Sequence, residues 1–447
     1  MPSDAHGDFY EVGAAVGDIT PPVGTPLTGN FRDDYASRGV HTPICCRSVV
    51  IRKDTSAVAI IAADLLTVCE ALVRQVRQQV EQRCGLGPGQ IMVAATHTHS
   101  GPPVEALTDG DDPAATLKAV LPGMVESCVR AWQSCRPMRL WAGPARSEGL
   151  CFNRRLRLKD GRTVMNWTLP PANSIDRPLG PVDEEIAVLL AGDDKDHPRF
   201  IAANLALHAA VLAGDNWLIS ADWPGYYYKA VRSIFGPDTT AMFLQGAEGN
   251  VNHIDVSDPL QGRGFKEAQR IGSAVGLAAA SARFGAEPVA GPVRWSRQTI
   301  ALPPRRLTEQ QVEQAGQIVA QSAGKERPRG QVDGVPDLLF AQDQIEMSGS
   351  SEVRQAEIQV LRVGQTAWVA LPGEFFVEYG LEIKRRSPAR ITFVVGLANG
   401  SLGYVPTEEA FAQGGYEPTP WRYSRLAPEA GRMCLDSVMR QLRDVFA

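Results

Sequence analysis

Two histidines stand one residue apart in the segment QIMVAATHTHSGPP, where an apolar run ends. They are His97 and His99, and the chain has only seven histidines in its 447 residues. The apolar run is typical of a buried strand, and open α/β sheets place their ligands at the carboxyl ends of such strands. Alternate residues of an extended segment point the same way. We therefore expect both imidazoles to face one site, one binding a metal ion and the other acting on a substrate.

Two more residues occupy similar places. His208 in NLALHAAVL lies near the end of another apolar strand, and Glu374 in ALPGEFF follows the strand TAWVALPG. A buried, unpaired carboxylate is costly, and a bound cation would offset that cost. Zinc binds imidazole nitrogen and carboxylate oxygen readily, so these residues form a candidate zinc site. A structural role is the alternative, because a single histidine is more often a hydrogen-bonded structural residue than a ligand.

The elements that must position these side chains alternate between strand and helix. Residues 57–66 and 90–96 have the apolar runs of buried strands, and residues 71–85 between them have a helical period. This is the pattern of a βαβ unit, and strand and helix signals stay interleaved to the end of the chain. The sequence predicts an α/β fold, as one domain over residues 1–447.

Two segments depart from this regular alternation. A helical period over residues 115–135 contains the step Leu121-Pro122-Gly123, where we expect the helix to be interrupted. Residues 322–352 are polar and rich in turn-forming residues, which is typical of an exposed excursion from the domain surface.

Composition and charge exclude some classes of function. The chain is 44% hydrophobic and 21% charged, which is typical of a folded enzyme. A net charge of −5 without runs of like charge argues against nucleic acid as a partner. The start lacks the features of a secretion signal, and no apolar stretch reaches the roughly 18 residues of a membrane span, so we expect a soluble, cytoplasmic protein. The eight cysteines form no CxxC pair and are expected to be reduced thiols.

The chain resembles the catalytic domain of the neutral ceramidase family. The resemblance rests on blocks that keep their order from about residue 12 to about residue 420: GAAVGDITPPVGTPLTG, GVHTPICCRSVVI, ATHTHSGPP, FNRR, NLALHAAV, LISADWPGY, GAEGNVN, LPGEFF and GLANGSLGYVPTEEAFAQGGYEP. It implies a fold of mixed β-sheets layered with α-helices. The additional C-terminal β domain of ceramidases is not expected, because the blocks extend nearly to the last residue, Ala447.

The resemblance also implies roles for individual residues. Carried over block by block, the family's catalytic zinc would be bound by two histidines, a glutamate and a tyrosine, which fall on His97, His208, Glu374 and Tyr404. A divalent ion stabilises phenolate, which makes a tyrosine ligand chemically reasonable.

Two further residues receive catalytic roles from the same blocks. His99 would hydrogen-bond the reacting groups, and Arg154 in FNRR would hold the substrate carbonyl oxygen. Arg155 is the alternative for the arginine, because the two are neighbours. Surface ion pairing is the structural alternative for either arginine, and a half-buried structural side chain is the alternative for Tyr404.

One block departs from the family pattern. Ceramidases have a serine where GAEGNVN ends, whereas this chain has Asn252. An amide cannot attack a carbonyl as a nucleophile, so Asn252 would orient water or substrate instead. The aromatic residues of GDNWLISADWPGYYY are expected either to wall the pocket or to pack in the core. His253 and Asp222 receive no firm role, although a turn is the expected place of Asp222.

Three functional hypotheses follow from these residues. The leading one is a zinc-dependent hydrolase that cleaves an amide bond of a small or amphiphilic N-acyl substrate with metal-activated water. The second keeps the metal but changes the chemistry to that of an esterase, a lactonase, or a lyase acting on a polyol or sugar. The third is a catalytically inactive metal-binding or ligand-binding protein. The sequence does not identify the substrate or the oligomeric state.

Overall fold

Two β-sheets packed face to face form the centre of the protein. The computed structural model describes residues 9–32, 34–105, 112–322 and 331–447, and within them a nine-stranded sheet has the order β14-β12-β11-β6-β1-β3-β4-β5, with β16 beside β6. Its strands are β1 (Phe9–Asp18), β3 (Cys45–Lys53), β4 (Ser56–Ala63), β5 (Ile91–Ala95), β6 (Arg136–Arg146), β11 (Glu185–Gly192), β12 (Pro198–Leu205), β14 (Thr240–Gln245) and β16 (Glu287–Pro288).

The second sheet within the described part of the chain has four strands, in the order β17-β20-β21-β23. Its strands are β17 (Val293–Leu302), β20 (Arg354–Val363), β21 (Thr366–Ala370) and β23 (Ile391–Val395).

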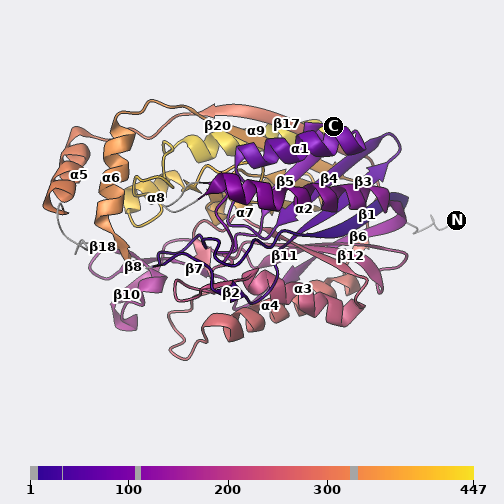
Figure 1. The fold of residues 1–447 in the computed structure, drawn as a ribbon, viewed down its shortest axis with the longest axis horizontal. Coiled ribbons are helices and arrows are strands. Elements are labelled where there is room, and N and C mark those ends of the chain that lie inside the picture. The colour runs from indigo at the N-terminus through magenta and orange to yellow at the C-terminus, as the bar shows by residue number, and fades with distance from the viewer. Residues whose placement is uncertain (1–8, 33, 106–111, 323–330) are drawn as a thin grey trace.

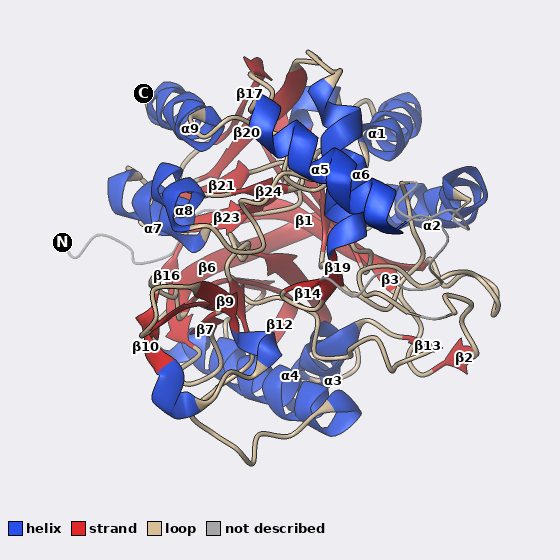
Figure 2. Cartoon of the chain, turned by 90° about the vertical axis from the view of Figure 1, so that its left-hand side faces the viewer, coloured by secondary structure: helices blue, strands red, loops and turns tan. Residues whose placement is uncertain are grey.

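Helices cover the outer faces of both sheets, so the order of layers is helix, sheet, sheet, helix (Figures 1 and 2). Over the large sheet, α1 and α2 pack on β3 to β5, and α3 and α4 pack on β11, β12 and β14. Over the small sheet lie α7 and α9. The helices of the described residues are α1 (Glu70–Cys84), α2 (Pro113–Gln133), α3 (Asp222–Phe235), α4 (Gly264–Ser281), α5 (Glu309–Ser322), α6 (Asp337–Ser348), α7 (Val377–Arg386), α8 (Glu408–Gln413) and α9 (Ala430–Phe446).

The core between the two sheets explains why the strands read as continuous apolar runs. Ile60 and Leu189 of the large sheet and Leu361 and Trp368 of the small sheet belong to one buried cluster. The helices also bury the opposite face of strands such as β4, β5 and β21, so neither face of these strands needs polar residues. The predicted α/β fold of mixed sheets layered with helices is confirmed, because the small sheet and the large sheet each combine parallel and antiparallel pairs.

Three parallel pairs of strands point their carboxyl ends at one edge of the molecule. They are β4 and β5 around α1, β12 and β14 around α3, and β21 and β23 around α7. The first of these is the predicted βαβ unit. Backbone hydrogen bonds link the loops at this edge: Ala95 N donates to Leu397 O at 3.1 Å, and Gly396 N donates to Gln245 O at 3.0 Å. The segments that follow β5, β14 and β23 are therefore held together although they come from different sheets.

The predicted interruption of the helix at residues 121–123 is wrong. Helix α2 runs without a break through Pro122. A proline inside a helix costs about 3 kcal/mol, but the residues around it, such as Val120 and Met124, are buried against the sheet. Gly123 allows this approach, because a Cβ atom there would lie 2.2 Å from Asp18 O.

The expected excursion at residues 322–352 also contains regular structure. Helix α6 lies in it, while residues 323–330 fall outside the described part of the chain. The ring centroid of Phe340 is 4.7 Å from that of Trp421, and Asp343 pairs with Arg422 at 2.9 Å. These partners are about eighty positions away in the sequence, so local composition does not reveal them.

Short strands complete the described structure around the ends of the sheets. They are β2 (Gly39–Val40), β7 (Phe152–Asn153), β8 (Arg155–Leu158), β9 (Thr163–Met165), β10 (Ile175–Pro178), β13 (Leu218–Ile219), β15 (Val251–Asn252), β18 (Gln331–Val332), β19 (Val335–Pro336), β22 (Glu374–Phe375) and β24 (Tyr404–Val405). Among the described residues, none of the helices has the length and apolar character needed to cross a membrane.

Candidate metal centre

His97 and His99 meet at the carboxyl end of β5, but not on an extended segment as predicted. His97 has a φ of +70°, in the left-handed region that a residue with a side chain rarely adopts. Such strain is typical of functional sites. The two rings nevertheless lie edge to face with centroids 4.8 Å apart, and their Nε2 atoms are 3.3 Å apart. The turn, rather than the alternation of a strand, brings the two imidazoles together.

Backbone carbonyls fix how two of the imidazoles point. His97 Nδ1 donates to Leu66 O at 2.8 Å, and His208 Nδ1 lies 3.0 Å from both Glu248 O and Val251 O. A carbonyl accepts only from a protonated nitrogen, so each ring carries a proton on Nδ1 and turns Nε2, which has a lone pair in the neutral ring, toward the cluster. Both lone pairs then face the same point, which is how metal-binding histidines are usually oriented.

Glu374 places a carboxylate between these two lone pairs. Its Oε2 atom lies 3.5 Å from His97 Nε2 and 3.3 Å from His208 Nε2. Burial would raise the pKa of Glu374, but hydrogen bonds from His97 and His208, and the positive charge these imidazoles carry when protonated, hold it well below its usual value. The carboxylate is positioned by β22, which pairs in parallel with β24 and sets Glu374 opposite Tyr404.

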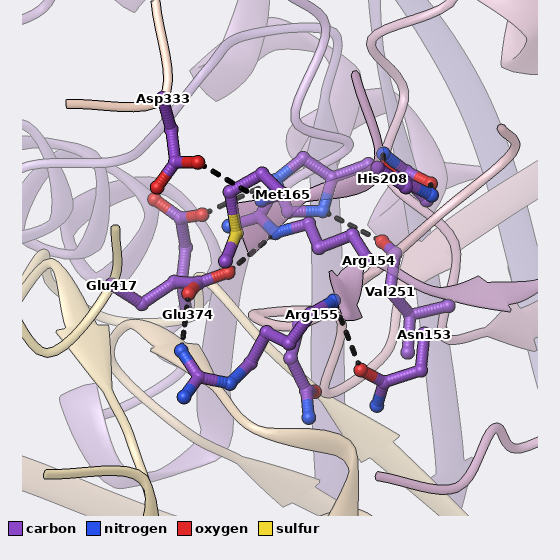
Figure 3. A network of polar contacts seen from close by, with 12 residues as sticks. Asn153, Arg154, Arg155, Met165, His208, Val251, Asp333, Glu374 and Glu417 are labelled. Carbon is purple, nitrogen blue, oxygen red and sulfur yellow. Dashed lines mark hydrogen bonds and ion pairs between the residues drawn. The ribbon is translucent and has the colours of Figure 1, made fainter. Parts of the chain in front are cut away.

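Arg154 is the arginine that faces the histidines. Its Nη1 atom is 3.1 Å from His208 Nε2, and its guanidinium carbon is 5.3 Å from the ring centroid of Tyr404. Glu417 holds this orientation by accepting from Arg154 Nε at 2.7 Å and from Arg155 Nη1 at 2.8 Å, a network visible in Figure 3. Arg154 Nη2 is buried without a hydrogen-bond partner among the described residues. One donor of the guanidinium therefore remains for another molecule.

Three of the four predicted metal ligands thus converge, together with one carboxylate that was not predicted. Four side chains place one ligand atom each within 4.8 Å of one another: His97, His208, Glu248 and Glu374. By the same criterion, His99 forms a second group with His97 and His208. Two lone pairs of nitrogen and an ionised carboxylate oxygen suit a divalent metal ion, and a cation would relieve the crowding of buried anions.

Comparison with known proteins identifies the family and the fold. Residues 10–268 match the family model described as neutral/alkaline non-lysosomal ceramidase, N-terminal. The chain belongs to this family. A neutral ceramidase of Pseudomonas aeruginosa is 24% identical over 93% of this chain and 70% of its own length. A neutral ceramidase of Mycobacterium tuberculosis is 25% identical over 56% of this chain and only 41% of its own length.

Solved ceramidase structures share the fold. A structure described as a ceramidase complexed with C2 superposes with a TM-score of 0.76 at 20% identity, over 97% of this chain and 75% of that one. The crystal structure of neutral ceramidase from Pseudomonas aeruginosa gives a TM-score of 0.75 at 21% identity, over 97% of this chain and 74% of that one. The resemblance carried by the sequence blocks is confirmed at the level of family and fold.

In this member of the ceramidase family, Asn252 is engaged with another amide. Asn166 Nδ2 donates to Asn252 Oδ1 at 2.7 Å, and Asn252 Nδ2 donates to Asn166 Oδ1 at 2.8 Å. Asn252 Oδ1 also accepts from the backbone N of Ile254 at 3.0 Å. The reciprocal pair fixes the position of Asn252 and leaves one N–H of its amide without a partner among the described residues. The partner Asn166 gave no signal in the sequence, because it lies 86 positions away.

Glu248 is the member of the cluster that sequence reasoning missed. It lies in the block GAEGNVN, directly after β14, and is fully buried. The rule that singled out Glu374, a carboxylate just beyond an apolar strand, applies equally to Glu248. Burial is the main cause that raises the pKa of Glu248, to about 8, and the charge of Glu374 acts in the same direction.

The remaining candidates lie outside the cluster. His253 belongs to neither of the two candidate metal-binding groups. Its side chain is buried, and burial lowers its pKa to about 4. Asp222 is the first residue of α3, and its side chain accepts from the backbone N of Trp223 and of Leu212, so it holds a segment ten residues away and does not serve a local turn alone. Trp223 and Tyr227 of the predicted aromatic wall pack in the core cluster with α3 and α4 instead.

Other rings surround the arginine. The centroid of Trp167 is 5.1 Å from the guanidinium carbon of Arg154 and 5.3 Å from the centroid of Tyr416. Tyr416 in turn lies 5.7 Å from Tyr404. Trp167 and Tyr416 are partly exposed, so this aromatic surface borders solvent next to the cluster.

Proposed function

We propose that this protein is a zinc-dependent hydrolase that cleaves the amide C–N bond of a small or amphiphilic N-acyl substrate. The observation that carries the proposal is the meeting of His97, His208 and Glu374 across two sheets, with Glu374 Oε2 lying 3.5 Å from His97 Nε2 and 3.3 Å from His208 Nε2. Relatives named neutral ceramidase support the reaction class, since a ceramidase by name cleaves an N-acyl lipid.

His97, His208 and Glu374 would hold the zinc ion. The fourth position belongs either to Tyr404, as the family resemblance implies, or to a second carboxylate of the cluster. When bound, zinc supplies Lewis-acid chemistry, lowering the pKa of water to near 7 and polarising a carbonyl group. The carbonyl hydrogen bonds to His97 and His208 keep both rings in the tautomer that this role needs.

The protein's own groups would then position and protonate the reactants. His99 is partly exposed, and its Nδ1 atom has no partner among the described residues, so this imidazole is placed to take a proton from water and give it to the leaving amine. Arg154, held by Glu417, would direct its free Nη2 at the substrate oxygen as negative charge develops. Asn252, fixed by Asn166, would orient the water or the substrate through its remaining N–H.

The aromatic surface favours a substrate with an apolar arm. Trp167 and Tyr416 are partly exposed beside Arg154, so an acyl chain could lie on these rings while the amide reaches the metal. This supports an amphiphilic substrate over a fully polar one.

The test combines metal analysis with substrate turnover in labelled water. Purified protein should contain about one zinc per chain, hydrolyse members of a panel of N-acyl amides of different chain length, and place ¹⁸O from water in the acid product. His208→Ala should lose both zinc and turnover, whereas Glu378→Gln, which changes a carboxylate outside the cluster, should keep both. Turnover that persists unchanged after all divalent metal has been removed would overturn the proposal.

The same panel separates the alternative chemistries. Matched esters and lactones included beside the amides would reveal an esterase if only they are cleaved. A product that forms without ¹⁸O would indicate elimination, the chemistry of a lyase.

A further inference from the structure

Glu248 lies where a carboxylate has no structural partner. Its side chain is fully buried, and neither Oε1 nor Oε2 has a hydrogen-bond partner among the described residues. A buried polar group without a partner is costly and rare in folded proteins. By contrast, Glu417, another buried carboxylate, is paired with two arginines. The burial of Glu248 without a partner therefore indicates that its carboxylate binds a ligand.

The backbone aims this carboxylate at the metal cluster. The same residue accepts the Nδ1 proton of His208 with its backbone oxygen, at 3.0 Å, and so is attached to one proposed ligand already. A ligand oxygen of Glu248 lies within 4.8 Å of His97, His208 and Glu374 ligand atoms. Gly249, the next residue, packs so closely on β22 that a Cβ atom there would lie 2.4 Å from Glu374 O. The two glutamates are thus held side by side by their backbones.

We propose that Glu248 is a direct metal ligand, so that the centre is built from two histidines and two glutamates. Two carboxylates balance the two positive charges of a divalent ion. An ionised Tyr404 side chain is then not needed, and Tyr404 stays a neutral phenol beside Arg154. The inference rests on the proposed function only in requiring that the cluster binds a metal ion.

The experiment measures metal affinity rather than turnover. Zinc affinity would be determined by competition with a chromophoric chelator for the wild type, Glu248→Gln, Tyr404→Phe and the control Glu378→Gln. Glu378 is a good match because it accepts from Asn250, two residues from Glu248, but lies outside the cluster. We expect Glu248→Gln to weaken zinc binding at least about tenfold, since even partners of metal ligands contribute 10- to 100-fold. Tyr404→Phe and Glu378→Gln should each change the affinity less than about threefold.

A spectroscopic readout tests contact with the metal itself. Cobalt-substituted protein should show a visible absorption spectrum that changes in Glu248→Gln and stays as in the wild type in Tyr404→Phe. The far-ultraviolet circular dichroism and thermal unfolding of each metal-free variant show whether it is folded. If Glu248→Gln does not fold, Glu248→Asp takes its place, and it should bind zinc with an affinity between those of the wild type and His208→Ala.

The outcomes distinguish this inference from the proposed function. Glu248→Gln with the zinc affinity and cobalt spectrum of the wild type would overturn it, even if His208→Ala loses the metal. A strong loss of affinity in Tyr404→Phe combined with no loss in Glu248→Gln would also overturn it, and would restore the tyrosine as the anionic ligand. A wild type that binds no divalent metal would overturn both the inference and the proposed function.

Discussion

Glu417 lies between two guanidinium groups and has no exposed surface. Burial would raise the pKa of its carboxyl, but Arg154 and Arg155 lower it below its usual value. A folded-state pKa below the unfolded one means that the ionised group stabilises the fold above the unfolded pKa, and that this stabilisation is lost as the pH falls through the folded pKa. Glu417→Gln should therefore reduce the free energy of unfolding at pH 7 by about 3–5 kcal/mol, because it leaves buried charges unpaired.

Urea unfolding at pH 7 and at acid pH checks this prediction. The difference between wild type and Glu417→Gln should shrink as the pH falls below about 4, where the wild-type carboxyl becomes protonated as well. Glu382→Gln is the control, since Glu382 forms an exposed pair with Arg385 and should change stability by less than about 0.5 kcal/mol. A pH-independent difference would contradict the ionic origin of the effect.

The amide pair of Asn252 and Asn166 makes a second prediction for single residues. Each amide is the other's donor and acceptor, so removing either leaves its partner unsatisfied in a buried place. Asn252→Ala and Asn166→Ala should each lower the free energy of unfolding by about 1–3 kcal/mol. The double variant should lose less than the sum, with a coupling energy of about 0.5–3 kcal/mol in a double-mutant cycle. Strictly additive losses would show that the pair is not formed in solution.

The elements at the sheet edge are predictable because each carries its own local signal. The apolar runs of β5, β12 and β21 and the polar residue beyond each run are enough to indicate His97, His208 and Glu374. The left-handed turn at His97 has no such signal, because neither a glycine nor an asparagine marks it. Helix α6 was not predicted, because the residues that it contacts, such as Trp421 and Arg422, are far away in the sequence and leave no local signal.

One prediction concerns how elements position the cluster. Gly249 lies against β22, and an alanine Cβ there would come 2.4 Å from Glu374 O. Gly249→Ala should displace the strand that carries Glu374 and weaken zinc binding at least about tenfold, because ligands tolerate little displacement. Gly285→Ala serves as the control, since its Cβ would meet nothing within 4 Å. Competition with a chelator measures both. Equal zinc affinity in the two variants would mean that β22 does not set the ligand geometry.

For the whole molecule, the cluster lies where the two sheets meet, and these sheets pack together mainly through apolar side chains with a few hydrogen bonds such as that from Asn204 Nδ2 to Val394 O. His97 and His208 follow strands of the large sheet, whereas Glu374 follows β21 of the small one. A metal ion that binds only the folded state should stabilise it by about 2.7 kcal/mol when free zinc is 100 times its dissociation constant. For a chain of 447 residues this corresponds to a rise of about 3 °C in Tm.

Thermal unfolding with and without zinc tests this consequence, and hydrogen exchange locates it. The amides that join the two sheets at this edge, such as Ala95 and Gly396, should exchange more slowly in the zinc-bound protein, because opening the edge would break the metal site. His97→Ala should abolish both the shift in Tm and the added protection, while Glu378→Gln should keep both. Zinc that raises Tm equally in His97→Ala would indicate binding elsewhere, and the cluster would then have no part in holding the two sheets together.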